Sequence, residues 1–136
     1  MTVEAVSTDE ANLRSLLSRM TGDDKHSNAA TSTLTALQVL YDQVLNVDPS
    51  RPDDPERDRF FLSKGHGPMA YYAVLAAKGF IDVDELDSWA EFDSRLGLHP
   101  DGVLVPGIEI GSCSLGHGLA LVVGTARGLR AQGRLQ

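Results

Sequence analysis

Histidine side chains are the feature of this 136-residue sequence best suited to chemistry. Their imidazoles exchange protons near neutral pH and hydrogen-bond polar substrates. None of the four lies within a clear helical or strand pattern, and three are next to glycine or proline. They are His26, His66, His99 and His117. A single histidine of this kind is more typical of an exposed surface. Several together favour a shared site, although composition alone does not show that they converge.

His66 has the most informative surroundings. It follows an apolar run, Phe60–Leu62, that predicts a short buried strand. It also lies between two glycines, which leave the backbone free on both sides, and Pro68 can occupy the first turn of a helix. Open α/β folds place ligand-contacting groups at such strand ends. The alternative is a solvent-facing histidine in an ordinary turn, and this segment alone does not decide between the two.

The elements that must position these histidines are mainly helices. The spacing of apolar residues predicts helices over residues 11–20, about 31–35 to 47, 68–78, 82–92 and 115–131. Residues 1–10 are expected to be disordered, and the proline-rich stretch 48–58 is expected to be a connector. Because Phe60–Leu62 is the one predicted strand, this segment alone is expected to be mostly α-helical.

The helix predicted over residues 115–131 carries one narrow face. Small residues recur there every four positions, at Gly116, Ala120, Gly124 and Gly128. Such a face lets another helix approach closely, which indicates a tight core or subunit contact. The alternative is a small-residue helix that rests on the chain's own sheet.

Composition excludes several classes of function. The length fits one domain, and a net charge of -7 without a basic cluster argues against nucleic-acid binding. No apolar run is long enough for a membrane span, and no signal peptide is visible, so a cytoplasmic protein is expected. The single cysteine, Cys113, excludes an intrachain disulfide and every multi-cysteine metal site.

Three blocks of the sequence resemble the transketolase family. Residues 58–67, which read Asp-Arg-Phe-Phe-Leu-Ser-Lys-Gly-His-Gly, are similar to the family signature Asp-Arg-Phe-x-Leu-Ser-Lys-Gly-His. The second block joins Gly97–Pro100 to Val105–Glu109, and the third is Ser114–Leu119. One block alone would be a weak signal, but three in the family's order and spacing are strong evidence of homology. The resemblance spans about His26–Arg130.

The resemblance implies an α/β thiamine-diphosphate-binding fold, of which residues 1–136 would be the N-terminal part. It implies a transferase that passes a two-carbon ketol unit, or a related acyl unit, with thiamine diphosphate as the electron sink. By position, His66 would lie beside the cofactor's reactive centre, His99 would contact donor hydroxyls and assist proton transfer, and His26 would help to deprotonate the substrate. Cys113 and Leu115 match the backbone segment that packs against the aminopyrimidine ring.

The chain also departs from the family pattern at three places. Lys25–Asn28 replaces the family's Gly-His-Pro-Gly, Cys113 replaces a glycine, and His117 replaces a glutamine. A side chain at position 113 would crowd the pyrimidine unless the backbone shifts. Such changes suit altered substrate specificity, or relaxed selection on a site that no longer turns over.

The sequence stops before the family's Gly-Asp-Gly motif, whose aspartate and a following asparagine hold Mg²⁺, and it lacks the pyrimidine-binding domain. We therefore expect no metal ligands here, and neither tight cofactor binding nor catalysis by the isolated chain. The first hypothesis is a subunit of a split, oligomeric transketolase-like enzyme. Its partner chains would supply the missing parts, and its substrate would be a sugar phosphate or keto compound. The alternatives are a non-catalytic remnant or regulatory interaction module, and a truncated product.

Overall fold

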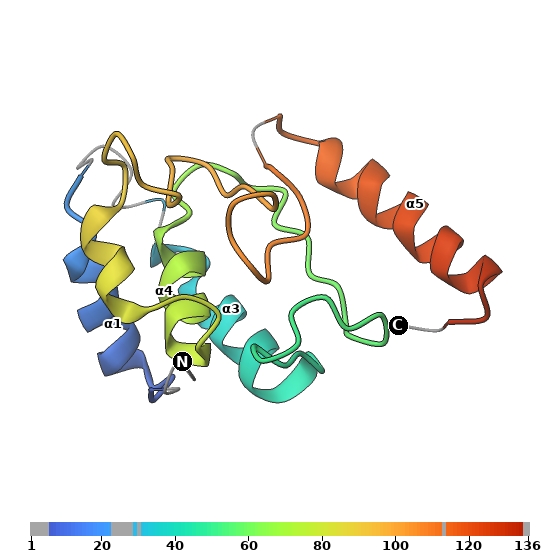
Figure 1. The fold of residues 1–136 in the computed structure, drawn as a ribbon, viewed down its shortest axis with the longest axis horizontal. Coiled ribbons are helices and arrows are strands. Elements are labelled where there is room, and N and C mark those ends of the chain that lie inside the picture. Colours follow the sequence, from blue (N-terminus) through green and yellow to red (C-terminus); the bar gives the residue numbers. More distant parts are fainter. Residues whose placement is uncertain (1–5, 23–28, 30, 113, 135–136) are drawn as a thin grey trace.

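A computed structural model describes residues 6–22, 29, 31–112 and 114–134. Its described elements are all helical and are joined by long turns (Figure 1). They are α1 (Glu10–Arg19), α3 (Leu34–Val39), the π-helical turn η2 (Leu40–Val44), α4 (Met69–Lys78), the 3-10 helix η3 (Val83–Ser88) and α5 (His117–Ala131). A mostly helical segment is what the sequence predicts.

Helix α4 is the centre of the core. Every residue from Met69 to Ala77 is at most 6% exposed, and α1, α3 and η3 all pack against this helix. A helix that is apolar on all sides is stable only when it is enclosed in this way. Pro68 precedes its first turn, and Gly79 ends it in the left-handed conformation with a φ of 85°. The predicted helix over 68–78 is therefore confirmed.

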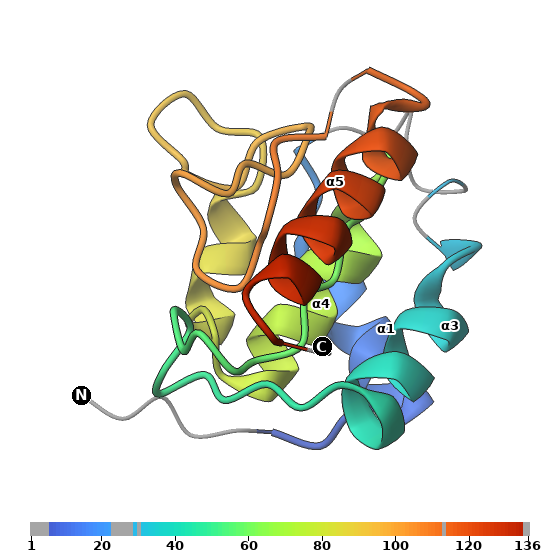
Figure 2. The same cartoon turned by 90° about the vertical axis from the view of Figure 1, so that its right-hand side faces the viewer.

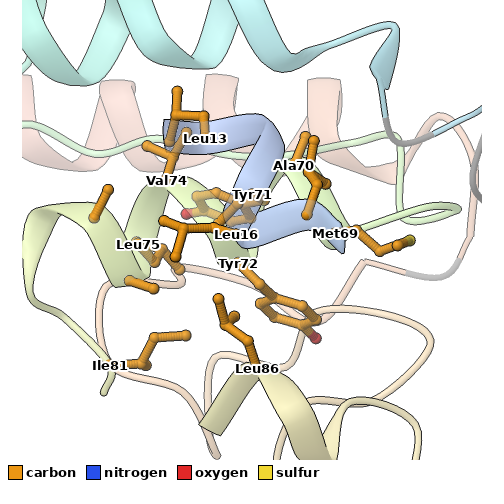
Figure 3. Close-up of a cluster of buried hydrophobic side chains, with 14 of the residues drawn as sticks. Leu13, Leu16, Met69, Ala70, Tyr71, Tyr72, Val74, Leu75, Ile81 and Leu86 are labelled. Carbon is orange, nitrogen blue, oxygen red and sulfur yellow. The ribbon is translucent and has the colours of Figure 1, made fainter. Parts of the chain in front are cut away.

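Apolar side chains from α1, α4 and η3 meet in one cluster (Figure 3). Helix α1 begins where the sequence predicts, because the Asp9 carboxylate accepts a hydrogen bond of 2.8 Å from the Asn12 backbone N–H. At its other end, Arg19 donates to Asp84 and Asp87 of η3. These contacts fix η3 and α1 to each other on the side of α4 away from the chain's C-terminal part.

The second predicted helix is interrupted. Its α-helical part, α3, ends at Val39, and the chain widens into the single π-helical turn η2, in which the Leu45 N–H donates to the Leu40 carbonyl at 2.8 Å. The helix stops there and does not reach residue 47. Asn46 and Asp58 instead bond to each other through backbone and side chain. This pairing closes the stretch 48–58 into a series of turns.

Residues 60–62 do not form the expected strand. No β-strand occurs in the described ranges, because a strand needs a neighbouring backbone to pair with and this stretch has none there. Phe60 packs its ring edge-on against Tyr41 and Tyr71 instead, with ring centroids 5.8 and 5.4 Å apart. The apolar run thus marks a partly buried segment that packs against the core, and not a sheet.

The acidic helix expected over 82–92 is one short 3-10 helix. An Asp82–Glu85 capping box begins η3, and the chain leaves it at Trp89, whose buried indole N–H donates to the Gly97 carbonyl. Ala90 then adopts a φ of 64°, a left-handed value that no continuing helix allows. The need to bury Trp89 therefore sets the end of this element.

Helix α5 stands apart from the other described helices, with loop segments between it and α4 (Figure 1), and it crosses in front of α4 in the view turned by 90° (Figure 2). Of its residues, Gly118 and Leu129 are buried. A Cβ at Gly124 or Gly128 would have nothing within 4 Å, so the narrow face makes no tight contact with the described part of the chain. No helix in the described ranges is both long and apolar enough to cross a membrane.

Candidate functional site

The structure brings His66 and His99 together. Their ring centroids are 5.0 Å apart and the ring planes are inclined by 78°, an edge-to-face arrangement. His66 is exposed and His99 is partly buried, so the pair opens on the surface. Two of the four histidines therefore converge, as the hypothesis of a shared site requires. They come from loops that are far apart in the sequence.

Two glycines let these loops approach each other. A Cβ at Gly65 would overlap the Ser112 carbonyl oxygen and lie 3.1 Å from Cδ2 of His99. A Cβ at Gly118 would overlap the Ser63 side chain in the same way. The loop that carries His66 is thus pressed against residues 112–118 at two points, and a larger residue at either glycine would force them apart.

The hydroxyl of Tyr72 and the indole of Trp89 fix the turn that carries His99. Tyr72 lies with its hydroxyl 3.1 Å from the Gly97 carbonyl oxygen and 3.3 Å from that of His99, and Trp89 donates to Gly97 as well. Tyr71 donates to the Gly107 carbonyl at 3.0 Å. Burial raises the pKa of both tyrosines, so their hydroxyls remain neutral donors through the physiological range.

Ion pairs connect the first two sequence blocks. Glu109 accepts from Arg57 at 2.8 Å and from Arg59 at 3.5 Å, and all three side chains are less than 20% exposed. Charged hydrogen bonds of this kind are strong when they are shielded from water. The start of the block 58–67 is therefore held to the end of the loop 97–109, which further limits how His66 and His99 can move apart.

Lys64 ties the same loop to the segment that precedes α3. Its ammonium group lies 2.6 Å from the Ala29 carbonyl oxygen and 2.7 Å from the Ser32 hydroxyl. His26, a predicted site residue, is three positions before Ala29 but falls outside the described residues. In the sequence, Lys64 stands out only as part of a motif. The position of Lys64, two residues before the glycine-flanked His66, is the available signal that this lysine could link two loops.

The remaining predicted site residues are not gathered around this pair by any contact within the described ranges. Cys113 lies outside the described residues. Leu115 is 68% exposed, and His117 is the exposed first residue of α5. Ser112, which the sequence does not single out, is 4% exposed, and its hydroxyl has no hydrogen-bond partner among the described residues. Ser112 is also the residue whose carbonyl oxygen lies against Gly65.

The donor types suit one part of a thiamine diphosphate and not the other. Imidazoles, a hydroxyl and backbone N–H and C=O groups can hold an organic ring system. Mg²⁺ requires several oxygen ligands, and no group of three or more metal-binding side chains exists among the described residues. The donor groups described at this site are therefore of the kind that contacts an organic ring.

Comparison with known proteins agrees on one family. The family model described as transketolase, thiamine diphosphate binding domain, matches residues 17–133. One of the subunits of the apulose-4-phosphate transketolase of Phocaeicola vulgatus is 45% identical over 74% of this chain and 36% of its own. The transketolase structure from Leishmania mexicana superposes with a TM-score of 0.73 at 30% identity, covering 90% of this chain and 19% of that one.

A further relative carries a different name. The protein called ferredoxin fas2 of Rhodococcoides fascians is 58% identical over 90% of this chain and 40% of its own. Protein iron–sulfur clusters are ordinarily held by four cysteines, and this sequence has one, so the shared stretch holds no such ligand set. The chain spans about two fifths or less of the length of these curated relatives.

Proposed function

The chain belongs to the transketolase family, and we propose that it supplies one wall of a thiamine diphosphate site that transfers a two-carbon ketol or related acyl unit. The observation that carries this proposal is the His66–His99 pair, 5.0 Å between ring centroids, at the meeting point of the three resembling blocks. Within this site, bound thiamine diphosphate would supply the electron sink for cleavage beside a ketose carbonyl.

We assign separate tasks to the two histidines. His66, which is exposed, faces the cofactor's reactive centre and orients the substrate carbonyl there. His99 accepts and returns a proton at a donor hydroxyl through its imidazole, a role for which histidine is suited near neutral pH. The edge-to-face packing holds the two imidazoles against each other, with Nε2 of His99 buried. His26 belongs to the proposed proton relay, and the backbone at Cys113 and Leu115 belongs to the proposed ring contact.

Residues outside these 136 must complete the site. We propose that a Gly-Asp-Gly segment binds Mg²⁺ and that a pyrimidine-binding domain activates the cofactor, neither of which is in this sequence. Helix α5 supports this division, because Leu119, Leu121 and Val123 are 71%, 46% and 50% exposed. Residues 118–124 of α5 include no charged side chain, and a helix surface of this kind is ordinarily buried. We propose that the completing polypeptide packs around α5 as part of an oligomeric, split enzyme.

The name of one relative supports a proposal for the substrate class. The Phocaeicola relative is named as one subunit of an apulose-4-phosphate transketolase. We propose a phosphorylated or otherwise anionic sugar as donor, with the groups that bind its anion located on the completing polypeptide. The described face around His66 and His99 would supply hydrogen-bonding groups for the donor's hydroxyls.

Isolation of the native assembly tests the proposal. The chain, purified from its host with whatever polypeptide accompanies it, should be found with a partner or an extension that carries a Gly-Asp-Gly segment. The assembly should bind thiamine diphosphate with Mg²⁺ and transfer two-carbon units from a ketose phosphate. An assembly that carries those segments but binds no cofactor would instead favour the non-catalytic interaction module.

A further inference from the structure

Two neighbouring tyrosines of α4, both labelled in Figure 3, direct their hydroxyls to separate parts of the loop 94–111, at Gly107 and at the turn 97–99. Tyr71 and Tyr72 are 1% and 0% exposed. Tyr71 accepts from the Tyr41 hydroxyl and donates to the Gly107 carbonyl, each at 3.0 Å. Tyr72 donates to the carbonyl oxygens of Gly97 and His99. The chain thus offers two equivalent phenols on one rigid helix, of which only one contacts the backbone of a site histidine.

The bond from Tyr72 acts on the backbone that orients His99. The hydroxyl proton of Tyr72 is shared between the carbonyl oxygens of Gly97, at 3.1 Å, and His99, at 3.3 Å. The hydroxyl therefore fixes the whole turn 97–99 and not one peptide group. The indole of Trp89 donates to Gly97 at 3.2 Å, but it does not reach the carbonyl of His99. The hydrogen bond from Tyr72 to the His99 carbonyl therefore fixes a point of the turn that Trp89 does not contact.

There is little space for His99 to move without changing the pair. Its Cδ2 lies 3.1 Å from the position that a Cβ on Gly65 would take, so its ring lies directly over the loop of His66. A shift of a few tenths of an ångström in the His99 backbone would change the ring contact, because side chains at this density cannot absorb displacement. We infer that Tyr72 is a positioning residue for His99, setting its imidazole against His66 from the buried core.

The catalytic consequence of this inference rests on the proposed function, but its geometric content does not. We therefore choose a direct readout of the ring pair, the nuclear Overhauser effect between ring protons of His66 and His99 in the histidine-labelled chain. The variants are Tyr72→Phe and, as a matched control, Tyr71→Phe. Each change removes one buried hydroxyl from the same helix and preserves the ring.

Both variants should lose a similar amount of stability, roughly 5 °C in thermal midpoint. The wild-type chain and Tyr71→Phe should show the His66–His99 effect at equal intensity, whereas Tyr72→Phe should reduce it at least twofold. Equal intensity in all three chains would overturn the inference and make Tyr72 an ordinary core residue. Absence of the effect in the wild-type chain would overturn it as well, because the pair would not exist.

Turnover by the native assembly separates this inference from the proposed function. Tyr72→Phe should lower kcat about tenfold with little change in KM, while Tyr71→Phe stays within about twofold of the wild type. Unchanged kcat in Tyr72→Phe, despite a lost ring contact, would overturn the catalytic part of the inference. A wild-type assembly without two-carbon transfer would refute the proposed function and leave the geometric result standing.

Discussion

At the scale of single residues, the site depends on glycines, whose lack of a Cβ lets neighbouring segments approach closely. Gly65 and Gly118 have no Cβ, and this allows the His66 loop to rest on the Ser112 carbonyl and the Ser63 side chain to rest on α5. The histidines themselves are held by neighbours and not by their own burial, since His66 is exposed and His99 only partly buried. Function at this scale therefore depends on small residues beside reactive ones.

Substitution of Gly65 by alanine tests this dependence. The added methyl group would overlap the Ser112 carbonyl, so we expect Gly65→Ala to lower the free energy of unfolding by about 1–3 kcal/mol. Gly128→Ala is the matched control, since a Cβ there has nothing within 4 Å, and a helical alanine should stabilise the chain by roughly 0.5–1 kcal/mol. Chemical denaturation measures both. Equal effects of the two changes would refute the close approach.

At the scale of elements, the sequence predicts helices well where their signals are local. The Asp9 cap, the apolar spacing of α1 and the boundaries of α4 at Pro68 and Gly79 all act within one or two turns. The strand predicted at Phe60–Leu62 is wrong because three apolar residues in a row do not show whether a second strand lies beside them. The early end of η3 depends on burial of Trp89, which is a tertiary contact.

The candidate site divides in the same way. Motif similarity singles out His66 and His99, but no spacing rule shows that their rings meet, because the meeting depends on the long loop 94–111. The supporting roles of Lys64, Tyr72 and Ser112 depend on which backbone atoms they face. Such contacts have no periodicity in sequence, so they become visible only with coordinates.

The pairing of Glu85 with Arg95 gives a pH prediction at this scale. Hydrogen bonding to the Arg95 guanidinium lowers the pKa of Glu85 below its ordinary value of 4.5, against the opposing effect of burial. A depressed folded-state pKa means that the pair stabilises the fold above about pH 4.5 and loses this contribution as the pH falls through the lower folded value.

The measurement compares wild type with Glu85→Gln by chemical denaturation at pH 7 and at pH 3. Glutamine can keep the capping box, while it removes the charge and one of the two oxygens that accept from Arg95. Wild type should lose about 0.5 kcal/mol more than the variant on acidification, a modest amount because both side chains are partly exposed. An equal loss in both chains would mean that this ion pair contributes nothing.

At the scale of the whole molecule, the fold is divided between a closed part and an open one. Helix α4 is enclosed by α1, α3 and η3, while α5, which runs along the near side of the molecule in Figure 2, has exposed apolar residues. The same chain holds converging histidines but, in the described residues, no metal-binding cluster. We interpret both features as properties of one piece of a larger thiamine-diphosphate-binding domain.

This division predicts that the 136-residue chain alone binds the cofactor weakly or not at all. Calorimetric titration with thiamine diphosphate and Mg²⁺ should give little or no heat, because no described cluster can hold the metal and the diphosphate. The same titration of the native assembly should give saturable binding. Tight binding by the isolated chain would show that the metal and diphosphate are held by residues to which we assign no such role.

The central claim is that His66 acts in two-carbon transfer, and one comparison tests it most directly. Turnover of a ketose phosphate donor is measured for the native assembly with wild-type chain and with His66→Ala, alongside the thermal midpoint of each. Loss of the proposed catalytic imidazole should lower kcat/KM by about 10²–10⁴-fold. Because His66 is exposed, stability should change by less than about 0.5 kcal/mol. Turnover that survives the substitution, or falls only in step with stability, would contradict the account.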